Sequence, residues 1–375
     1  MKNNRTFLEK LLDGAEVKWI PLGDVADYEQ PTKYLVNSTV YNDNYPTPVL
    51  TAGKTFILGY TNEDEGIYFA SKSPVIIFDD FTTANKWVDF DFKAKSSAMK
   101  MITSKNEKFA LLKYIYYWLN TLPNNQTDGD HKRQWISNYA NKLIPIPPLP
   151  VQTEIVKILD ALTALTSELT SELTLRRKQY EYYREKLLSE EELGKVGFEW
   201  KTLDQISENL DSKRKPITSG LRTSGKIPYY GASGIVDYVK DYIFDGDFLL
   251  ISEDGANLLA RNTPIAFSAS GKIWVNNHAH ILKFETYEER RFIEFYLNKI
   301  DLTPYISGAA QPKLNKKNLN SIKFPIPSIP EQQRIVSILD KFETLTHSIT
   351  EGLPLAIEQN QKRYEYYREL LLNFS

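Results

Sequence analysis

The stretch Tyr180-Glu-Tyr-Tyr-Arg-Glu185 recurs letter for letter as Tyr364-Glu-Tyr-Tyr-Arg-Glu369. A hexapeptide this rich in aromatic and charged residues seldom repeats by chance. The copy extends upstream, where residues 145–160 and 325–340 are identical at ten of sixteen positions and keep a constant offset (325 − 145 = 180). The chain therefore contains a long internal duplication.

The duplication also includes the segments that begin at Trp19 and Trp200, which agree at the tryptophan, at a leucine and at a later aliphatic residue. A period near 180 residues indicates a duplicated domain, because solenoid repeats are far shorter. A chain of 375 residues is long enough for two equivalent globular units.

The composition is that of an ordinary globular protein, with 42% hydrophobic and 25% charged residues. The absence of cysteine excludes disulfides, thiolate catalysis and cysteine-based zinc motifs. No stretch has the roughly 18 apolar residues that a membrane span needs, so we expect a cytoplasmic protein with no membrane partner. The net charge of −2 restricts any DNA-binding surface to a local basic face.

The spacing of apolar residues predicts a long helix from about Pro150 to Leu188. Between Ile155 and Leu187, eight of the ten positions at alternating four- and three-residue spacing are apolar or aromatic, which is typical of a coiled-coil helix. At ~1.5 Å per residue, such a helix spans roughly 57 Å.

The second copy of this helix is expected to begin at Ser328 and to break near Gly352. Ser328 and Glu331 have the spacing of a capping box, and Glu351-Gly-Leu-Pro354 interrupts the heptads. The second copy holds four more residues between its shared Asp and Tyr than the first (364 − 340 = 24, 180 − 160 = 20). These residues form a stutter, which unwinds or kinks a supercoil.

A single helix of this kind would leave its apolar seam in water, so we expect the two copies to pair with each other, antiparallel. Glu9-Lys-Leu-Leu12 echoes Glu185-Lys-Leu-Leu188, which suggests a truncated third copy of the helix. An amphipathic cap is the alternative for these N-terminal residues. The first interpretation gives a circularly permuted, pseudo-two-fold α+β protein, in which two mixed α/β domains are joined by two long antiparallel coiled-coil helices.

The expected boundaries follow from this duplication. They are an N-terminal helical segment at 1–16, a first domain at 17–149, a central helical spacer at 150–195, a second domain at 196–329 and a C-terminal helical spacer at 330–375. The two domains differ sharply in sequence while the helices stay alike, which suggests one frame that presents two different recognition surfaces.

The whole chain resembles the DNA-specificity subunit of type I restriction-modification enzymes. The resemblance rests on the paired Pro-Ile-Pro leads, on the Glu-Gly-Leu-Pro turn at 351–354 and on the two hexapeptides. In the second domain it also rests on the stretches at 229–235, 253–257, 274–280 and 307–313. The first helix lacks the Glu-Gly-Leu-Pro turn, which puts partner contacts there in doubt.

This resemblance implies two target-recognition domains, each of which reads one half of a bipartite, asymmetric site in double-stranded DNA. The helices would set the spacing between the half-sites and dock two methyltransferase (modification) subunits. Motor-endonuclease (restriction) subunits would complete the complex. The resemblance implies no catalysis and no cofactor in this chain, since S-adenosylmethionine, ATP and Mg belong to the partner subunits.

The residues themselves leave two other classes of function open. His278 and His280 lie two residues apart, so on a strand both would face the same side, with Glu253 and Asp254 as possible carboxylate ligands of a metal-dependent nuclease. A coiled-coil scaffold without DNA affinity is the other alternative. The chain has no phosphate-binding loop, no dinucleotide-type glycine pattern and no Asn-Pro-Pro-Tyr-like methyltransferase motif, and we expect no metal site.

Matching loops of the two domains are the candidates for DNA contact. Residues 50–54 and 230–234 are glycine-containing loops in which backbone amides can approach phosphate. Residues 79–83 and 253–257 are polar turns after strands, where an Asn can read adenine and acids can accept from cytosine. A solvated turn that caps a strand is the alternative for the second pair.

Two further pairs of segments complete the candidate surface. Residues 96–98 and 276–278 place polar side chains next to lysines, and residues 131–134 and 311–317 precede the Pro-rich leads, where we expect phosphate contacts. Ordinary surface charge is the alternative for the last pair. The expected DNA-binding residues are Thr51, Lys54, Thr82, Thr83, Lys93, Lys95, Ser96, Ser97, His131, Lys132 and Arg133 in the first domain, and Tyr230, Ser233, Asn257, Lys272, Asn276, Asn277, His278, Gln311 and Lys313 in the second.

The tyrosines of the hexapeptide have a different expected role. Tyr180 and Tyr183 are three residues apart, which places them in the helix seam, with Glu181, Arg184 and Glu185 outside as ion-pair partners. We expect core packing rather than base stacking from them.

Overall fold

A computed structural model describes residues 6–53, 55–123, 133–308 and 311–374 of the chain. The chain divides into two compact units, of which unit 1 comprises Met1–Leu169 and Ala356–Ser375 and unit 2 comprises Thr170–Leu355. No helix in the described ranges is both long and apolar enough to cross a membrane.

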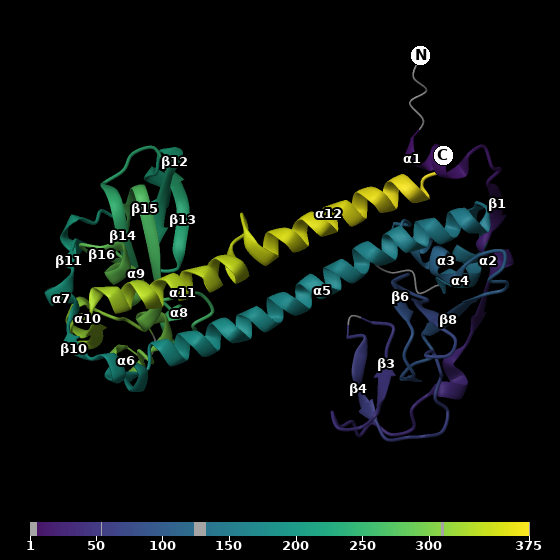
Figure 1. Cartoon of the computed structure of the whole chain (residues 1–375), viewed down its shortest axis with the longest axis horizontal. Coiled ribbons are helices and arrows are strands. Elements are labelled where there is room, and N and C mark those ends of the chain that lie inside the picture. Colours follow the sequence, from purple (N-terminus) through teal and green to yellow (C-terminus); the bar gives the residue numbers. More distant parts are fainter. Residues whose placement is uncertain (1–5, 54, 124–132, 309–310, 375) are drawn as a thin grey trace, which may run out of the picture. The chain divides into compact units, whose positions relative to one another are not determined.

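Long helices follow both of the Pro-rich leads. Helix α5 (Leu149–Leu187) is one uninterrupted ribbon, whereas α11 (Ile329–His347) and α12 (Gly352–Leu372) are separated by the non-helical residues 348–351 (Figure 1). The predicted helix at 150–188 and the predicted break near Gly352 are therefore confirmed. The four extra residues of the second copy are taken up in a loop.

The predicted capping box at Ser328 does not form. Ser328 is the N-cap of α11, but its side chain makes no capping hydrogen bond. The carboxylate of Glu331 instead pairs with Arg334, with 2.6 Å between Oε1 and Nη2. The backbone of Ser328 starts the helix, since its carbonyl accepts from the amide of Glu331 at 3.0 Å.

The helices pack antiparallel within each unit, as the seam predicts. In unit 1, the side-chain nitrogen Nδ2 of Asn360 on α12 donates to the Leu162 carbonyl of α5 at 2.8 Å, and Leu371 lies in a core with Val151. In unit 2, Tyr183 of α5 stacks on Phe342 of α11, with 5.5 Å between ring centroids. The rings of Tyr180 and His347 meet edge to face, with 5.6 Å between their centroids. In both units, residue numbers rise along one helix as they fall along the other.

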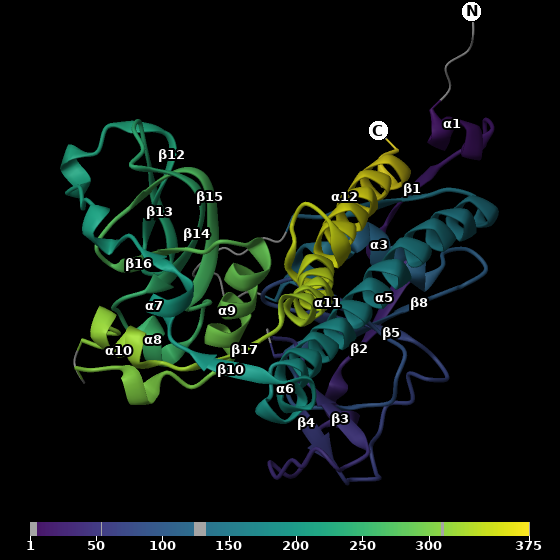
Figure 2. The ribbon, with the colours of Figure 1, turned by 60° about the vertical axis from the view of Figure 1, so that its left-hand side comes forward.

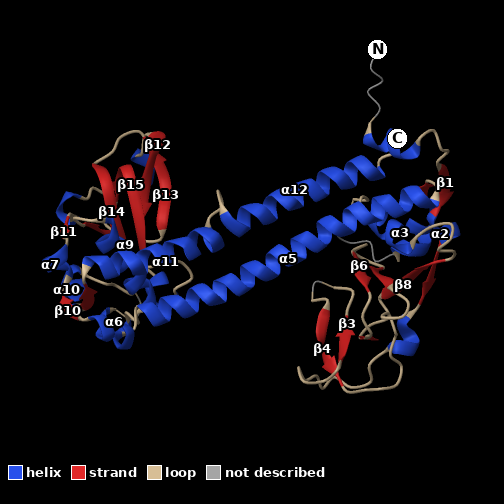
Figure 3. Cartoon of the chain, in the orientation of Figure 1, coloured by secondary structure: helices blue, strands red, loops and turns tan. Residues whose placement is uncertain are grey.

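Unit 1 is built from short strands and helices (Figure 3). Its elements are α1 (Phe7–Leu12), β1 (Lys18–Pro21), α2 (Leu22–Val25), β2 (Ala26–Glu29), η1 (Pro31–Tyr34), β3 (Thr47–Leu50), β4 (Ile57–Thr61), β5 (Val75–Asp79), β6 (Asn85–Val88), β7 (Lys93–Ala94), β8 (Met99–Ser104), α3 (Leu112–Leu119), α4 (Gln134–Ser137), η2 (Tyr139–Asn141) and β9 (Leu143–Ile146).

Unit 2 is also built from strands and short helices, and its strands form a sheet beside α9 (Figure 2). They are α6 (Glu190–Val196), β10 (Phe198–Lys201), α7 (Leu203–Ile206), β11 (Glu208–Asn209), η3 (Asp211–Lys213), η4 (Ser219–Leu221), β12 (Ser224–Gly231), β13 (Gly234–Val239), β14 (Phe244–Ser252), α8 (Asn257–Ala260), β15 (Ala266–Val275), β16 (Ala279–Lys283), α9 (Tyr287–Lys299), η5 (Thr303–Tyr305), α10 (Lys316–Ser321) and β17 (Phe324–Pro327).

The two units share one strand order. Unit 2 has a six-stranded sheet in the order β11-β16-β14-β15-β12-β13. Unit 1 repeats it as β2-β8-β5-β6 followed by the separate sheet β7-β3-β4, because β6 and β7 together occupy the place of the long strand β15. The duplicated sequence thus gives a duplicated topology, even where the residues differ.

The Pro-rich leads form strands that close each unit. Trp19 pairs with Pro145 in the β1–β9 ribbon, and Trp200 pairs with Pro325 in the β10–β17 ribbon. Both tryptophans remain about half exposed. A proline fits such a two-stranded ribbon because an edge position requires no inward amide.

Candidate nucleic-acid interface

In each unit, a pair of parallel strands brings two of the predicted loops together. In unit 1, β3 runs parallel to β7, and the backbone amide of Lys95 donates to the carbonyl of Leu50 at 2.9 Å. In unit 2, β12 runs parallel to β15, and the amide of Asn276 donates to the carbonyl of Tyr230 at 3.0 Å. Residues 51–53 and 95–98 therefore leave the sheet side by side, as do residues 231–234 and 276–278.

A buried acidic residue joins the other two predicted loops to the first pair in unit 1. The amide of Asp80 donates to the carbonyl of Ala98 at 3.2 Å, and the carbonyl of Asp80 accepts from the amide of Gln134 at 2.8 Å. Asp80 directly follows β5 and is 1% exposed. The described parts of all four predicted segments of unit 1 thus meet through backbone hydrogen bonds.

Glu253 occupies the same place in unit 2. Its amide donates to the carbonyl of His278 at 2.9 Å, and its carbonyl accepts from the amide of Leu314 at 2.8 Å. We call Asp80 and Glu253 the anchor acids. The sequence comparison matched Asp79 with Glu253, and the hydrogen bonds correct this by one residue.

Several predicted residues of unit 1 lie on this loop cluster with accessible side chains. Thr82, Ser97 and Arg133 are exposed, and Thr51, Lys95 and Ser96 are partly exposed. The hydroxyl of Thr51 donates to the carbonyl of Thr55 at 2.6 Å, which shapes its loop. Lys54, His131 and Lys132 lie outside the described residues.

Two predicted contacts in unit 1 do not fit the structure. The side chain of Lys93 is 2% exposed, and its ammonium group donates to the carbonyl of Glu65 at 2.6 Å and pairs with Glu63 at 3.0 Å. Thr83 is 1% exposed and has a φ of +64°. Both side chains are buried, Lys93 on β7 and Thr83 in the turn after β5, so neither can reach a base or a phosphate from its present position.

In unit 2 the exposed predicted residues are Ser233, Lys272, Asn277, His278, Gln311 and Lys313. Tyr230 is partly exposed and stacks on Phe267, with 6.1 Å between ring centroids. Lys272 lies over the ring of Tyr242 at 4.6 Å. Both contacts hold these side chains along β12 and β15.

Two predicted contacts in unit 2 also serve the loops. Asn276 is 6% exposed, and its side-chain oxygen accepts from the amide of His278 at 2.8 Å. The Asn257 side chain donates to the carbonyl of Thr263 and accepts from its amide, both at 3.0 Å. Both side-chain amides therefore close turns, and these bonds would have to break before either residue could read adenine.

The two histidines of the nuclease alternative have different surroundings. His278 is exposed and pairs with Asp254, with 2.8 Å between Nδ1 and Oδ2. His280 is buried, where Nδ1 lies 2.6 Å from Oδ2 of Asp211 and Nε2 lies 2.7 Å from the carbonyl oxygen of Leu314. His280 rather than His278 thus shares a cluster with acidic residues.

Asp211, Glu253 and His280 lie close enough together to resemble a metal-ligand set. However, Arg214 already lies within this cluster, with Nη1 at 2.6 Å from Glu253 and Nε at 3.6 Å from Asp211. Lys313 adds a second cation at 3.1 Å from Glu253. Side-chain cations thus balance the carboxylates, so the donor set does not fit a metal ion.

The cluster shifts the acidity of its members. Burial raises the pKa of Glu253, but the hydrogen bond from Arg214 and the nearby His280 and Lys313 outweigh it, so the pKa lies below its ordinary value. The pKa of Asp211 is lowered in the same way, by His280 against the effect of burial. In unit 1, burial lowers the pKa of Lys100, although Asp80 opposes this.

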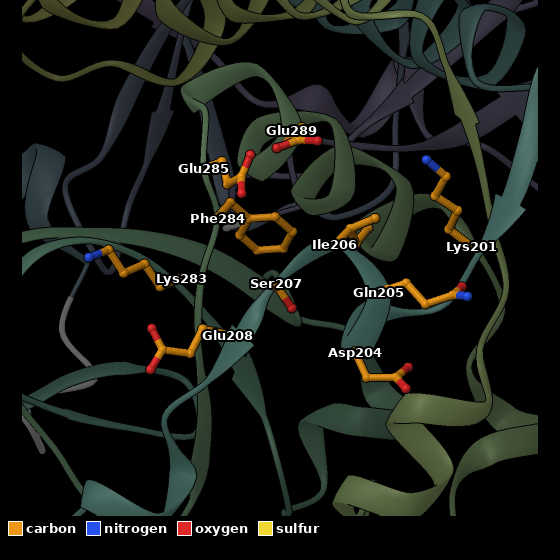
Figure 4. Close-up of a pocket in the computed structure, with 10 residues that line it drawn as sticks. All are labelled: Lys201, Asp204, Gln205, Ile206, Ser207, Glu208, Lys283, Phe284, Glu285 and Glu289. Carbon is orange, nitrogen blue, oxygen red and sulfur yellow. The ribbon is translucent and has the colours of Figure 1, made fainter.

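A separate hollow of unit 2, with a volume of about 560 Å³, is lined by acidic residues (Figure 4). Asp204, Glu208, Glu285 and Glu289 line it together with two lysines, Lys201 and Lys283. This excess of negative charge disfavours phosphate. The hollow is therefore not part of the candidate interface.

Sequence reasoning missed the buried partners of the anchor acids. In unit 1 the partner is Lys100, whose ammonium nitrogen lies 3.6 Å from Oδ2 of Asp80. The constant offset could have found it, because Lys100 matches His280 (280 − 100 = 180). Arg214 gave a similar signal, because the segments that begin at Trp19 and Trp200 are offset by 181 residues, which matches Arg214 with Lys33 (214 − 181 = 33). Lys33 instead pairs with Glu29 at 2.7 Å.

Comparisons with known proteins agree with the two-unit organisation. A family model described as type I restriction modification DNA specificity domain matches residues 15–175 and 195–359. The EcoR124I/EcoR124II specificity subunit of Escherichia coli is 51% identical, over 98% of this chain and 97% of that protein. The EcoprrI specificity subunit of Escherichia coli is 30% identical, over 92% of each.

One solved structure has the same fold along its whole length. The S subunit of a type I restriction-modification system from M. genitalium superposes with a TM-score of 0.69, covering 97% of this chain and 98% of that one. The sequence identity is 17%, so this likeness concerns the fold alone. Both sequence and structural matches extend through unit 1 and unit 2.

Proposed function

We propose, because this chain belongs to the family of type I restriction-modification DNA-specificity subunits, that each of its two units reads one half of a bipartite, asymmetric site in double-stranded DNA. By family, the chain is a non-catalytic subunit. One observation carries the proposal. The same backbone hydrogen bonds hold loops 95–98 and 276–278, but the side chains on these loops differ.

The loop clusters supply what DNA recognition requires. Cationic side chains attract phosphate and fix the protein on the duplex, and short polar side chains can read base edges. The proposed contacts in unit 1 are Thr51, Lys54, Thr82, Lys95, Ser96, Ser97, His131, Lys132 and Arg133. Those in unit 2 are Tyr230, Ser233, Lys272, Asn277, His278, Gln311 and Lys313.

The long helices are proposed to set the spacing of the half-sites and to dock two methyltransferase subunits. Docking is supported by exposed side chains that occur in both copies of the hexapeptide. Tyr182 and Tyr366 occupy the same position of the two hexapeptides and are 58% and 62% exposed. A partner that is present twice would find the same aromatic anchor on each copy.

The remaining parts of the complex are also proposals. Motor-endonuclease subunits would join the methyltransferase subunits, and the partners would bind S-adenosylmethionine, ATP and Mg. The chain would act in the cytoplasm, where bacterial DNA is found. None of the steps assigned to this chain requires a cofactor, since it positions its partners on DNA.

The experiment that tests the proposal is a map of adenine methylation. The chain is co-expressed with its cognate modification subunit, and methylated adenines are located throughout the DNA of the host. A gapped motif with two unlike halves is the expected result. A continuous palindrome, or no methylation beyond that of a strain without the chain, would contradict the proposal.

A further inference from the structure

We infer that the anchor acids, Asp80 and Glu253, are positioning residues that each set the loops which read one half of the DNA site. The inference rests on the proposed function. Neither side chain is available to DNA, because the two residues are 1% and 9% exposed. Each would therefore act through the loops bound to it.

Asp80 holds three segments of unit 1 at once. Its backbone bonds to Ala98 and Gln134, and its carboxylate oxygen Oδ1 accepts from the amide of Trp135 at 2.8 Å. The other oxygen, Oδ2, lies 3.6 Å from the ammonium nitrogen of Lys100 on the neighbouring strand β8. The proposed contacts Thr82, Ser97 and Arg133 lie within two residues of these bonded positions.

Glu253 holds the matching segments of unit 2 through different side chains. Its backbone bonds to His278 and Leu314, and its carboxylate accepts from Arg214 at 2.6 Å. Arg214 also donates to the carbonyl of Ala279 at 2.7 Å, next to the loop that carries Asn277 and His278. Lys313 is half exposed, so the carboxylate also holds a cation at the surface.

The buried negative charge of each anchor acid restricts which groups can surround it. A buried carboxylate is stable only when cations and donors surround it, so its partners have little freedom to move. Base readout requires the contacting groups to be held within about 0.5 Å of their productive places. A change at an anchor acid should therefore alter base preference without removing any side chain that touches DNA.

The partners of each anchor acid lie in one unit, which predicts the half-site that a substitution of that acid affects. All described partners of Asp80 belong to unit 1, and all those of Glu253 belong to unit 2. The substitutions Asp80→Asn and Glu253→Gln remove one charge and keep the side-chain shape. Each should relax one half of the motif, and the two variants should relax opposite halves.

The test uses the full complex with the modification subunit and a plasmid library in which each half-site is randomised. Methylated plasmids are sequenced to obtain the base preference at each position. In one half only, discrimination against single-base changes is expected to fall by about tenfold, the size of one good base contact. Asp43→Asn and Glu199→Gln, at exposed acids of the same two units, are matched controls that should leave both halves unchanged.

The milder variants Asp80→Glu and Glu253→Asp keep the buried charge and shift it by one methylene, so they guard against simple unfolding. They should relax the same halves as the neutral variants. Relaxation of both halves together, no relaxation, or loss of methylation together with loss of assembly would overturn the inference. If the wild-type complex gives no gapped motif, the proposed function fails instead.

Discussion

Gly352 lies against the carbonyl oxygen of Thr344, and a Cβ added to Gly352 would stand 2.5 Å from that oxygen. The φ of Gly352 is +77°, in the left-handed region that favours glycine. Gly352 begins α12 after the four residues that separate it from α11. The return of the chain into a helix after this break therefore depends on a residue without a side chain.

The substitution Gly352→Ala is expected to lower the free energy of unfolding by about 1–3 kcal/mol, because it adds backbone strain and a contact with a carbonyl oxygen. Chemical denaturation measures the change. The matched control is Gly194→Ala within α6, where no heavy atom lies within 4 Å of the added Cβ. The control should gain about 0.5–1 kcal/mol, and equal losses in the two variants would contradict the prediction.

Removal of a proposed phosphate contact should weaken DNA binding in a salt-dependent way. We expect Lys95→Ala and Arg133→Ala each to reduce the slope of log affinity against log salt concentration by about one. Fluorescence anisotropy of the assembled complex on its own target measures this slope. Lys362→Ala is the control, since this lysine lies on α12 and pairs with Glu358. A slope that falls as much for Lys362→Ala would argue against the loop cluster as the interface.

The repeated exposed tyrosines provide a test of partner docking. Tyr182→Ala and Tyr366→Ala should each weaken the binding of one modification subunit, by about 1–2 kcal/mol if the tyrosine is an interface anchor. The double variant should weaken both, which analytical ultracentrifugation of the mixed subunits can measure. Phe69→Ala removes an exposed aromatic ring of unit 1 that has no counterpart in the hexapeptides, and it should have no effect.

Acid should destabilise unit 2 through Glu253. The pKa of Glu253 is lower in the folded chain than its ordinary value of 4.5, so the unfolded state takes up the proton first as the pH falls. The stability that Glu253 contributes is complete above about pH 5.5 and is lost as the pH falls through 4.5 toward the lower folded value. Unfolding by urea between pH 7 and pH 3 should show a smaller loss in Glu253→Gln than in the wild type.

For the wild type and Glu253→Gln, the quantity to compare is the change of the unfolding free energy with pH rather than its absolute value. Above pH 6, the stability curves of the wild type and Glu253→Gln should run parallel, because the carboxyl group is ionised in both the folded and the unfolded state. Curves that remain parallel down to pH 3 would show that the lowered pKa of Glu253 has no effect on stability.

Patterns along the chain were sufficient to predict the long helices and the interruption of the second one. The predicted helix at 150–188 is observed at Leu149–Leu187, and the interruption before Gly352 is present. Of the predicted seam, Tyr180 is buried, and Tyr183 stacks on Phe342 although it is 40% exposed. These features depend on residues near one another in sequence, so periodicity and turn residues reveal them.

The loop residues were predicted less well. Lys93 looked like a phosphate contact beside Lys95, but its ammonium group lies in a buried pair with Glu63, thirty residues earlier in the chain. Asn276 looked like a base reader, but it is used to hold the amide of His278. Neither role could be read from neighbouring letters, because each depends on a partner or a turn geometry that the fold supplies.

The sequence by itself determined the duplication, the long helices, their interruption and the family, because each of these is written as a repeat or a period along the chain. Only the tertiary structure decided which polar residues of the loops face water and which are buried in hydrogen bonds and ion pairs. Asp80 and Glu253 show the physical reason. Their partners, Lys100 and Arg214, come from other strands and loops, and burial is a property of the assembled sheet rather than of any stretch of sequence.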